Sequence, residues 1–385
     1  MQFVDLKRQQ ALIRPQIEAN LMAVLDHGRY VMGPEIEQLE SKLAHLCGVK
    51  HAIGCASGTD ALLMALMASG IGPGDGVFTS PFTFIATAEA IRLVGATPIF
   101  VDIEPDSFNI DPQALAIAVD AAVQGQGGTG RAKPPRPAAV MPVDLFGLAA
   151  DYDRINTIAA RHQLVVIEDA AQSFGATYKG RRTCSLADVA GTSFFPAKPL
   201  GCYGDGGMCF TDDDHVAEKL RSVRMHGQGT DRYEHERIGI NGRLDSFQAA
   251  VLLAKCDIFE AELIQRRQVA DNYTSLLSAG NGQLKLPGHG DDYRSAWAQY
   301  SILAENDTQR DLLRSKLQEA GIPTAVYYPI PLHLQRAFLD LGYQKGDFPV
   351  SEACCRRIFS IPMHPYLEEQ QQRDLASVIN AHLVD

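Results

Sequence analysis

The chain has 385 residues, of which 46% are hydrophobic and 21% are charged, and its formal net charge is −11 at pH 7. A chain of this length and composition can bury two packed domains, or one large α/β domain with an appendage. The acidic balance argues against a nucleic-acid partner, and no run approaches the roughly 18 apolar residues that span a bilayer. Residues 1–8 lack the apolar core of a secretory signal, so we expect a cytoplasmic protein that binds no membrane.

The eight cysteines show neither a CxxC pair nor the Cys/His spacing of a metal site. We therefore expect reduced, partly buried thiols and no bound metal.

Helix-like and strand-like segments follow one another regularly along the first part of the chain. Two helices are predicted first, over residues 11–27, ending at Gly28, and over residues 35–46, where apolar residues recur at helical spacing. Strand-like and helix-like segments then alternate, at residues 51–55, 59–68, 76–79, 83–93, 97–102, 139–143, 152–161 and 164–169. This alternation predicts an α/β fold, with a parallel sheet covered by helices on both faces.

The later part of the chain has a different pattern. Residues 124–137 are rich in Gly and Pro and are predicted to form a flexible surface insertion. After about Lys255, long helices are predicted over residues 258–277 and 308–320, with strands around residues 297–303. We place a domain boundary there, between a large domain of residues 1–255, which includes the N-terminal helix, and a small domain of residues 256–385.

The most informative segment surrounds Lys198, which stands between aromatics, prolines and a glycine-rich turn. A partly desolvated lysine has a lowered pKa, and its neutral amine can form a Schiff base. Upstream, the predicted buried strand at residues 164–169 ends on Asp169. Singly these residues could be a loop lysine and a strand-end acid. Together they favour pyridoxal phosphate (PLP), whose pyridinium nitrogen needs a carboxylate and whose aldehyde needs an amine.

Other segments could hold the phosphate and the ring of such a cofactor. Gly58 and Thr59 stand between a strand and a helix, where free backbone N–H groups can bind an anion, although an ordinary helix cap is the alternative. Ser193 could add a hydroxyl or simply end its strand. Phe84 follows another strand and would emerge at the same edge of the sheet, where it could lie on a pyridine ring or, with Phe82, belong to the core.

Two further segments are polar or rigid. Residues 237–245 precede a helix predicted to be buried, and they could supply Asn241 and Arg243 to an anionic ligand or merely cap a loop. Aromatic-proline turns at residues 327–333 and 362–365 contain His333 and His364, which we interpret as structural rather than catalytic.

Taken in order, these segments resemble the sugar aminotransferases of the DegT/DnrJ/EryC1/StrS type. The likeness rests on GTDAL at 58–62, FTFIAT at 82–87, EDAAQSFG at 168–175, SFFPAK at 193–198, NGRLD at 241–245 and YPIPLH at 328–333. Around residues 202–205 and 225–228 the chain looks most like enzymes that aminate C3 of UDP-2-acetamido-2-deoxy-3-oxo-glucuronate for bacterial surface polysaccharides. It departs from the family at Tyr327, where His is frequent, and in its longer insertion at 124–137.

The resemblance implies an aspartate aminotransferase-like, fold-type I PLP-dependent transferase. Such a protein has a large domain with a mostly parallel sheet, a smaller C-terminal α+β domain, and a homodimeric assembly with active sites at the interface. Lys198 would bind the cofactor covalently and move protons, and Asp169 would pair with the pyridinium nitrogen. The remaining cofactor contacts would come from Gln172 at O3′, from Phe84 by stacking, and from Gly58, Thr59, Ser193 and the neighbouring subunit's Asn241 at the phosphate.

The resemblance also implies a reaction and its substrates. An amino group would pass from L-glutamate to a UDP-keto-sugar, with substrate contacts from Arg243, Tyr327, Tyr328 and His333, and with Arg243 at the sugar carboxylate. Related sugar dehydratases have histidine in place of the lysine, so Lys198 argues against dehydration. Two alternatives stay open: an aminotransferase for another UDP- or dTDP-keto-hexose, at C3 or C4, and a non-catalytic protein that binds PLP or a sugar nucleotide.

Overall fold

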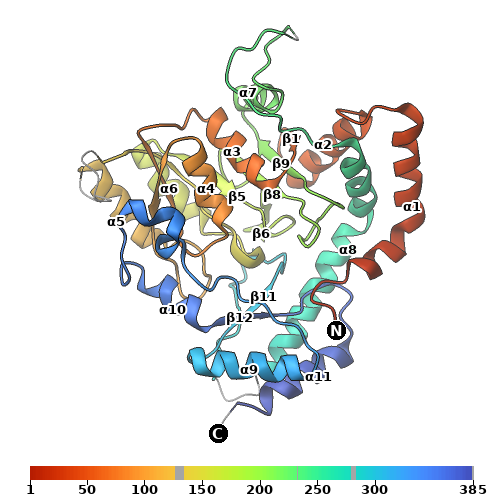
Figure 1. The fold of residues 1–385 in the computed structure, drawn as a ribbon, viewed down its shortest axis with the longest axis vertical. Helices are drawn as coiled ribbons and strands as arrows, with labels where there is room; N and C mark the ends of the chain where they lie inside the picture. Colours follow the sequence, from red (N-terminus) through yellow and green to blue (C-terminus); the bar gives the residue numbers. More distant parts are fainter. Residues whose placement is uncertain (126–133, 232, 279–282, 384–385) are drawn as a thin grey trace.

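A seven-stranded sheet forms the centre of the molecule (Figure 1) in a computed structural model that describes residues 1–125, 134–231, 233–278 and 283–383. The strand order is β1-β9-β8-β5-β4-β2-β3. The strands are β1 (His51–Cys55), β2 (Asp75–Thr79), β3 (Thr97–Phe100), β4 (Arg136–Val140), β5 (Val165–Asp169), β8 (Val189–Ser193) and β9 (Gly207–Thr211). Neighbouring strands from β3 to β8 run parallel, whereas β9 is antiparallel to both of its neighbours. The predicted parallel sheet is therefore confirmed, with β9 as an insertion of opposite direction.

Helices cover both faces of this sheet. They are α1 (Leu6–His27), α2 (Pro34–Cys47), α3 (Gly58–Ala68), α4 (Ile85–Leu93), α5 (Pro112–Val123), α6 (Tyr152–His162), α7 (Asp214–Arg224) and α8 (Ser246–Leu277). Successive strand residues point to opposite faces: Val189 packs in the core under α3, α4 and α7, while Ala190 packs in the core under α2 and α8. On β5, Ile167 packs on the side of α3, and its neighbour Val166 packs on the opposite side, against α5 and α6.

The C-terminal part of the chain has its own core, in the lower half of Figure 1. It contains the antiparallel pair β11 (Tyr300–Leu303) and β12 (Ile358–Ile361), with α9 (Asp307–Glu319), α10 (Pro349–Arg357) and α11 (Glu369–Asn380). The strand β10 (Tyr293–Arg294) pairs with β6 (Thr177–Tyr178), which pairs with β7 (Arg181–Arg182). These features agree with the expected fold-type I architecture.

The long helix α8 connects the two parts. Its first turns pack against the sheet core through Ala249 and Leu252, and its last turns enter the C-terminal core through Tyr273, whose ring lies 5.2 Å from that of Tyr300. The boundary predicted at residue 255 falls inside this continuous helix, and the two-domain division stays a prediction.

The structure changes several predicted limits. Helix α1 begins at Leu6 rather than residue 11, because Asp5 caps it by accepting a hydrogen bond from the N–H of Arg8 at 3.0 Å, and it ends before Gly28 as predicted. Helix α8 begins at Ser246, twelve residues before the predicted start at 258. Of the predicted insertion at 124–137, residues 126–133 lie outside the described residues.

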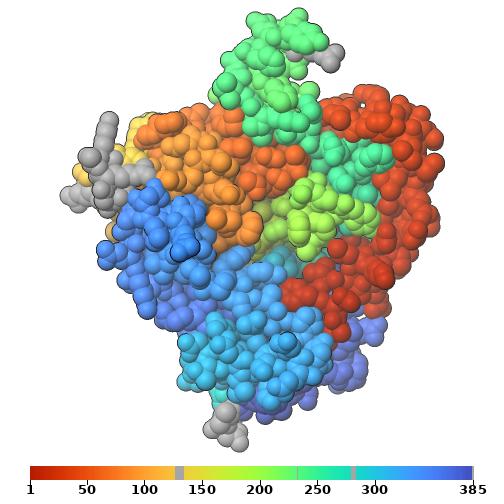
Figure 2. All heavy atoms as spheres, in the orientation of Figure 1, coloured from red at the N-terminus to blue at the C-terminus, as the bar shows by residue number. Residues whose placement is uncertain are grey.

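A narrow arm projects from the body beyond α7, at the top of Figures 1 and 2. Bridges between Gln228 and His235, and between Met225 and Asn241, bring its two sides together. Two large apolar side chains are highly exposed on it, Tyr233 at 81% and Ile238 at 86%.

Within the described ranges, every helix is too short or too polar to cross a bilayer. The same residues contain no cluster of three or more His, Cys, Asp or Glu side chains that could hold a metal ion.

Candidate active site

The two predicted catalytic residues lie at the same edge of the sheet. Asp169 ends β5 and is in register with Gly191 of the parallel neighbour β8. The chain leaves β8 at Ser193 and turns through a short loop that carries Lys198. The charges of Lys198 and Asp169 interact, since each shifts the pKa of the other. This is the carboxyl edge of parallel strands, where ligands bind in open α/β sheets.

Asp169 is a buried carboxylate that accepts hydrogen bonds from two donors. Its side chain is 3% exposed, and its Oδ2 accepts a bond from the Thr87 hydroxyl at 2.7 Å. Its Oδ1 accepts a bond from the N–H of Ala171 at 3.2 Å. Burial raises the pKa of Asp169, and the two donors together with Lys198 act in the opposite direction. The donors therefore favour the ionised form that a protonated ring nitrogen requires.

Lys198 is half-buried in its loop. Desolvation lowers the pKa of its amine to about 8, although Asp169 favours the charged form. A neutral amine is therefore accessible near neutral pH, as Schiff-base chemistry requires.

The N-terminus of α3 meets the end of β8 in a close backbone approach. A Cβ on Gly58 would lie 2.6 Å from the Cβ of Ser193, so only glycine fits there. Ser57 caps α3 by accepting a bond from the N–H of Asp60 at 3.0 Å. Among the described residues, the N–H groups of Gly58 and Thr59 have no acceptor. Ser57 therefore caps the helix, while the next two N–H groups stay available to an anion, and their role at a phosphate stays a prediction.

The two phenylalanines that the sequence left open have different environments. Phe82 is 1% exposed and belongs to the core, whereas Phe84, just before α4, is 55% exposed. The Phe84 ring centroid lies 6.3 Å from that of Tyr328, a residue of the C-terminal part. An exposed aromatic at the sheet edge is suited to cover a planar cofactor ring.

Gln172 joins the two parts of the chain at the site. Its Oε1 accepts a bond from the N–H of Phe146 at 2.8 Å, and its Nε2 donates to the hydroxyl of Tyr328 at 3.2 Å. The amide orientation is thereby set, with one N–H of Nε2 left to contact a ligand.

Three further predicted residues are Asn241, expected as a cofactor contact, and Arg243 and Tyr327, expected as substrate contacts. Asn241 is exposed and Arg243 half-buried, on a segment tied to the end of β1 by a bond from the N–H of Ala56 to the carbonyl of Gly242 at 3.1 Å. Within the described part of the chain, the Arg243 guanidinium has no acidic partner. Tyr327 is half-buried, and its ring meets Phe3 edge-on at 6.4 Å.

The two histidines are both buried. The ring of His333 is closed off from solvent, lies 3.2 Å from Glu352 and packs 4.7 Å from Phe348. His364 is 3% exposed. These surroundings favour the structural interpretation of both residues. The substrate contact implied for His333 stays a prediction, and nothing in its surroundings supports it.

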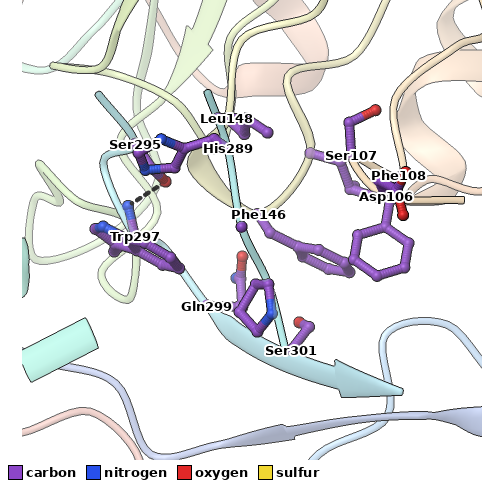
Figure 3. A pocket seen from close by; sticks show the side chains of 13 residues that line it. Asp106, Ser107, Phe108, Phe146, Leu148, His289, Ser295, Trp297, Gln299 and Ser301 are labelled. Atoms are coloured by element: carbon purple, nitrogen blue, oxygen red, sulfur yellow. Dashed lines mark hydrogen bonds between the residues drawn. The ribbon is translucent and has the colours of Figure 1, made fainter. Parts of the chain in front are cut away.

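A small, partly open pocket of about 30 Å³ lies at the seam with the C-terminal part (Figure 3). Phe146, Leu148, Trp297 and Gln299 are among the residues that line it, and the described lining residues include none of the predicted site residues. The N–H of Ala298 donates to the carbonyl of Phe146 at 3.1 Å. Since the N–H of Phe146 holds Gln172, the seam supports the active site through this backbone.

The comparisons with known proteins agree with this geometry. The model of the DegT/DnrJ/EryC1/StrS aminotransferase family matches residues 12–380. The chain belongs to this family. It is 48% identical over 369 residues, 96% of each chain, to the UDP-2-acetamido-2-deoxy-3-oxo-D-glucuronate aminotransferase of Pseudomonas aeruginosa.

Solved structures of similar proteins have the same fold. A Brucella abortus member has a TM-score of 0.93, with 48% identity and 99% of each chain covered. The Bacillus subtilis protein ntda, solved with bound cofactor PMP, has a TM-score of 0.85 and 30% identity, covering 96% of this chain and 82% of that one. The chain is therefore a PLP-dependent nucleotide-sugar aminotransferase, which confirms the expected fold, enzyme class and cofactor.

The residues at the sheet edge fit PLP. A buried carboxylate, an amine with a lowered pKa and two uncommitted backbone N–H groups converge there. Thr87 lies in the segment FTFIAT at 82–87 and was not among the predicted site residues. Thr83 precedes α4 and Thr87 lies within it, with their hydroxyls 3.2 Å apart, and no local pattern in the sequence singles out Thr87.

Proposed function

We propose that this aminotransferase moves the amino group of L-glutamate to C3 of UDP-2-acetamido-2-deoxy-3-oxo-D-glucuronate. The 48% identity to the Pseudomonas aeruginosa enzyme of that name supports this substrate. The structural observation that carries it is Arg243, a half-buried guanidinium with no acidic partner in the described part of the chain. A guanidinium binds a carboxylate through two parallel hydrogen bonds, and a uronate sugar carries such a carboxylate.

The residues at the sheet edge divide the chemistry between them. PLP, when bound, accepts the electrons of the carbanion that forms on the substrate. Asp169 holds the proton on the ring nitrogen, which makes the ring a better electron acceptor. The Nζ of Lys198 would move the proton between C4′ of the cofactor and the reacting carbon of the sugar, as a general base and acid whose pKa is lowered to about 8.

The remaining side chains and N–H groups orient the cofactor. In this proposal Gly58, Thr59 and Ser193 hold the phosphate, Gln172 contacts O3′ and Phe84 stacks on the ring. Tyr327 and Tyr328 face the sugar nucleotide. This assignment is supported by the free N–H groups at α3, the exposed ring of Phe84 and the link from Gln172 to Tyr328.

We also propose a homodimer with shared active sites. The arm beyond α7 projects away from the body (Figure 2). Tyr233 and Ile238 are exposed on it, and Asn241 and Arg243 follow in the chain. Apolar side chains exposed on α1, such as Leu12 and Met22, add to the surface that a second copy would cover. Asn241 would reach the phosphate, and Arg243 the sugar carboxylate, of the neighbouring subunit. The product would serve bacterial surface polysaccharide synthesis in the cytoplasm.

A panel of UDP- and dTDP-keto-sugars, with glutamate as donor, tests the substrate. The 3-oxo-glucuronate should be aminated far faster than the neutral 3-oxo-glucose analogue. Equal use of the two sugars would contradict the proposed role of the carboxylate. Absorbance of the bound cofactor that does not change on adding glutamate would instead favour a non-catalytic binding protein.

A further inference from the structure

Lys255 is a second lysine near the active site, buried in the middle of α8. Its side chain is 1% exposed, and its Nζ donates to the carbonyl of Gly201 at 2.6 Å. The Nζ also lies over the ring of Tyr203, 4.3 Å from the centroid. A buried ammonium is costly unless it is paired, so this position calls for an explanation.

Gly201 belongs to the loop that carries Lys198. The loop closes where the N–H of Cys202 donates to the carbonyl of Phe194 at 2.7 Å. Inside it the chain folds tightly, since a Cβ on Gly201 would lie 2.6 Å from the carbonyl oxygen of Phe195. A displacement of Gly201 would therefore be transmitted through this packed loop to Lys198.

Helix α8 holds the loop at a second point. Gln248, one heptad before Lys255, accepts a hydrogen bond from the N–H of Tyr203 at 2.9 Å. Residues seven apart lie on the same face of a helix. The helix thus fixes both the carbonyl of Gly201 and the N–H of Tyr203, two residues later.

We propose that Lys255 is a positioning residue, whose ammonium holds the carbonyl of Gly201 and thereby sets the loop from which Lys198 reaches the cofactor. Burial lowers the pKa of Lys255 to about 8, with Glu262 and Cys202 acting in the opposite direction. The amine can donate to Gly201 in either protonation state. This inference rests on the role proposed for Lys198.

The test compares holoenzymes with Lys255→Met and, as a matched control, Arg266→Met. Arg266 is also a buried cation on α8, 4% exposed, and donates to the carbonyl of Trp297 at 3.1 Å, in the C-terminal part. Hydroxylamine removes the cofactor from its lysine, and added PLP restores the linkage. The rate of cofactor release and the rate of its restoration are followed by absorbance, and the melting temperature of each variant is measured in parallel.

Lys255→Met should change the release and restoration rates by about tenfold or more, the effect of losing a charged hydrogen bond. Arg266→Met should lower the melting temperature and leave both rates near those of the wild type. Lys255→Arg, which keeps a donor for Gly201, should move the rates back toward wild type. If Lys255→Met fails to fold, Lys255→Gln carries the comparison.

Wild-type rates in Lys255→Met or Lys255→Gln would overturn the proposal and leave Lys255 a structural residue only. Failure of the underlying assignment gives a different result. In that case Lys198→Ala would keep the hydroxylamine-sensitive absorbance that the wild type shows.

Discussion

The hydroxyl of Thr87 donates a hydrogen bond to Oδ2 of Asp169 at 2.7 Å, and both side chains are almost fully buried. Thr87 lies in the first turn of α4, and Asp169 ends β5, so the bond joins a helix to the sheet edge. Because the bond lowers the pKa of Asp169 where burial raises it, Thr87 helps to keep the carboxylate ionised.

Thr87→Val should slow the half-reaction with glutamate about tenfold, the expected effect of losing one hydrogen bond to a charged group. The PLP dissociation constant should change less, because the phosphate contacts are intact. Thr83→Val is the control, since the Thr83 hydroxyl lies 3.2 Å from that of Thr87 and makes no hydrogen bond to Asp169 among the described contacts. Equal rates in the two variants would contradict the role of Thr87.

The pKa of Lys198 predicts how cofactor capture depends on pH. The neutral amine attacks the PLP aldehyde, and the amine is protonated below its pKa of about 8. The capture rate of cofactor-free protein should therefore rise with pH and level off above about 8. In Asp169→Asn the midpoint should move to lower pH, because Asp169 favours the charged amine. A wild-type midpoint near the ordinary lysine value of 10.5 would show that Lys198 is not desolvated.

Gly58→Ala should lower the free energy of unfolding by about 1–3 kcal/mol and weaken PLP binding, because its Cβ would lie 2.6 Å from the Cβ of Ser193. Gly290→Ala is the matched control, since nothing lies within 4 Å of a Cβ there. Adding Ser193→Gly to Gly58→Ala removes the clashing atom and should restore part of the stability. Chemical denaturation measures the free energy of unfolding of each variant. A Gly58→Ala variant as stable as the wild type would mean that the two segments separate easily.

Arg243→Ala should raise the KM for the 3-oxo-glucuronate sharply and affect the glutamate half-reaction less. Mixing Lys198→Ala and Arg243→Ala subunits tests whether sites are shared. If Arg243 serves the neighbouring subunit, each mixed dimer has one site with both residues intact, and part of the activity returns. Absence of recovery in mixtures that contain verified heterodimers would place Arg243 in the site of its own subunit.

The elements with strong local patterns could be predicted from the sequence. The β5 strand reads as a continuous apolar run that ends on acids, and the Gly28 cap marks the end of α1. Lys198 was recognisable because its neighbours are unusual for a surface lysine. The sheet edge that unites Lys198 with Asp169 then follows from parallel strand order.

Other features depend on contacts between distant residues, which local patterns do not encode. Nothing in the segment Gly207–Thr211 reveals that β9 inserts antiparallel between β1 and β8. The bond from Thr87 to Asp169 spans 82 residues, and that from Lys255 to Gly201 spans 54. In the sequence Lys255 looks like any lysine of an amphipathic helix, and only tertiary packing shows that it is buried.

The position of β9 has a consequence for synthesis of the protein. Strand β1 lies at the edge of the sheet and, among the strands of the described residues, pairs only with β9, with Cys55 opposite Gly207. On the ribosome, β1 emerges early and has no sheet partner until residues 207–211 have also left the exit tunnel. The turn after β1, which we propose to bind the cofactor phosphate, is therefore completed only after more than half of the chain has been translated. Its assembly coincides with closure of the sheet, and a chain truncated before β9 would leave an unpaired edge open to aggregation.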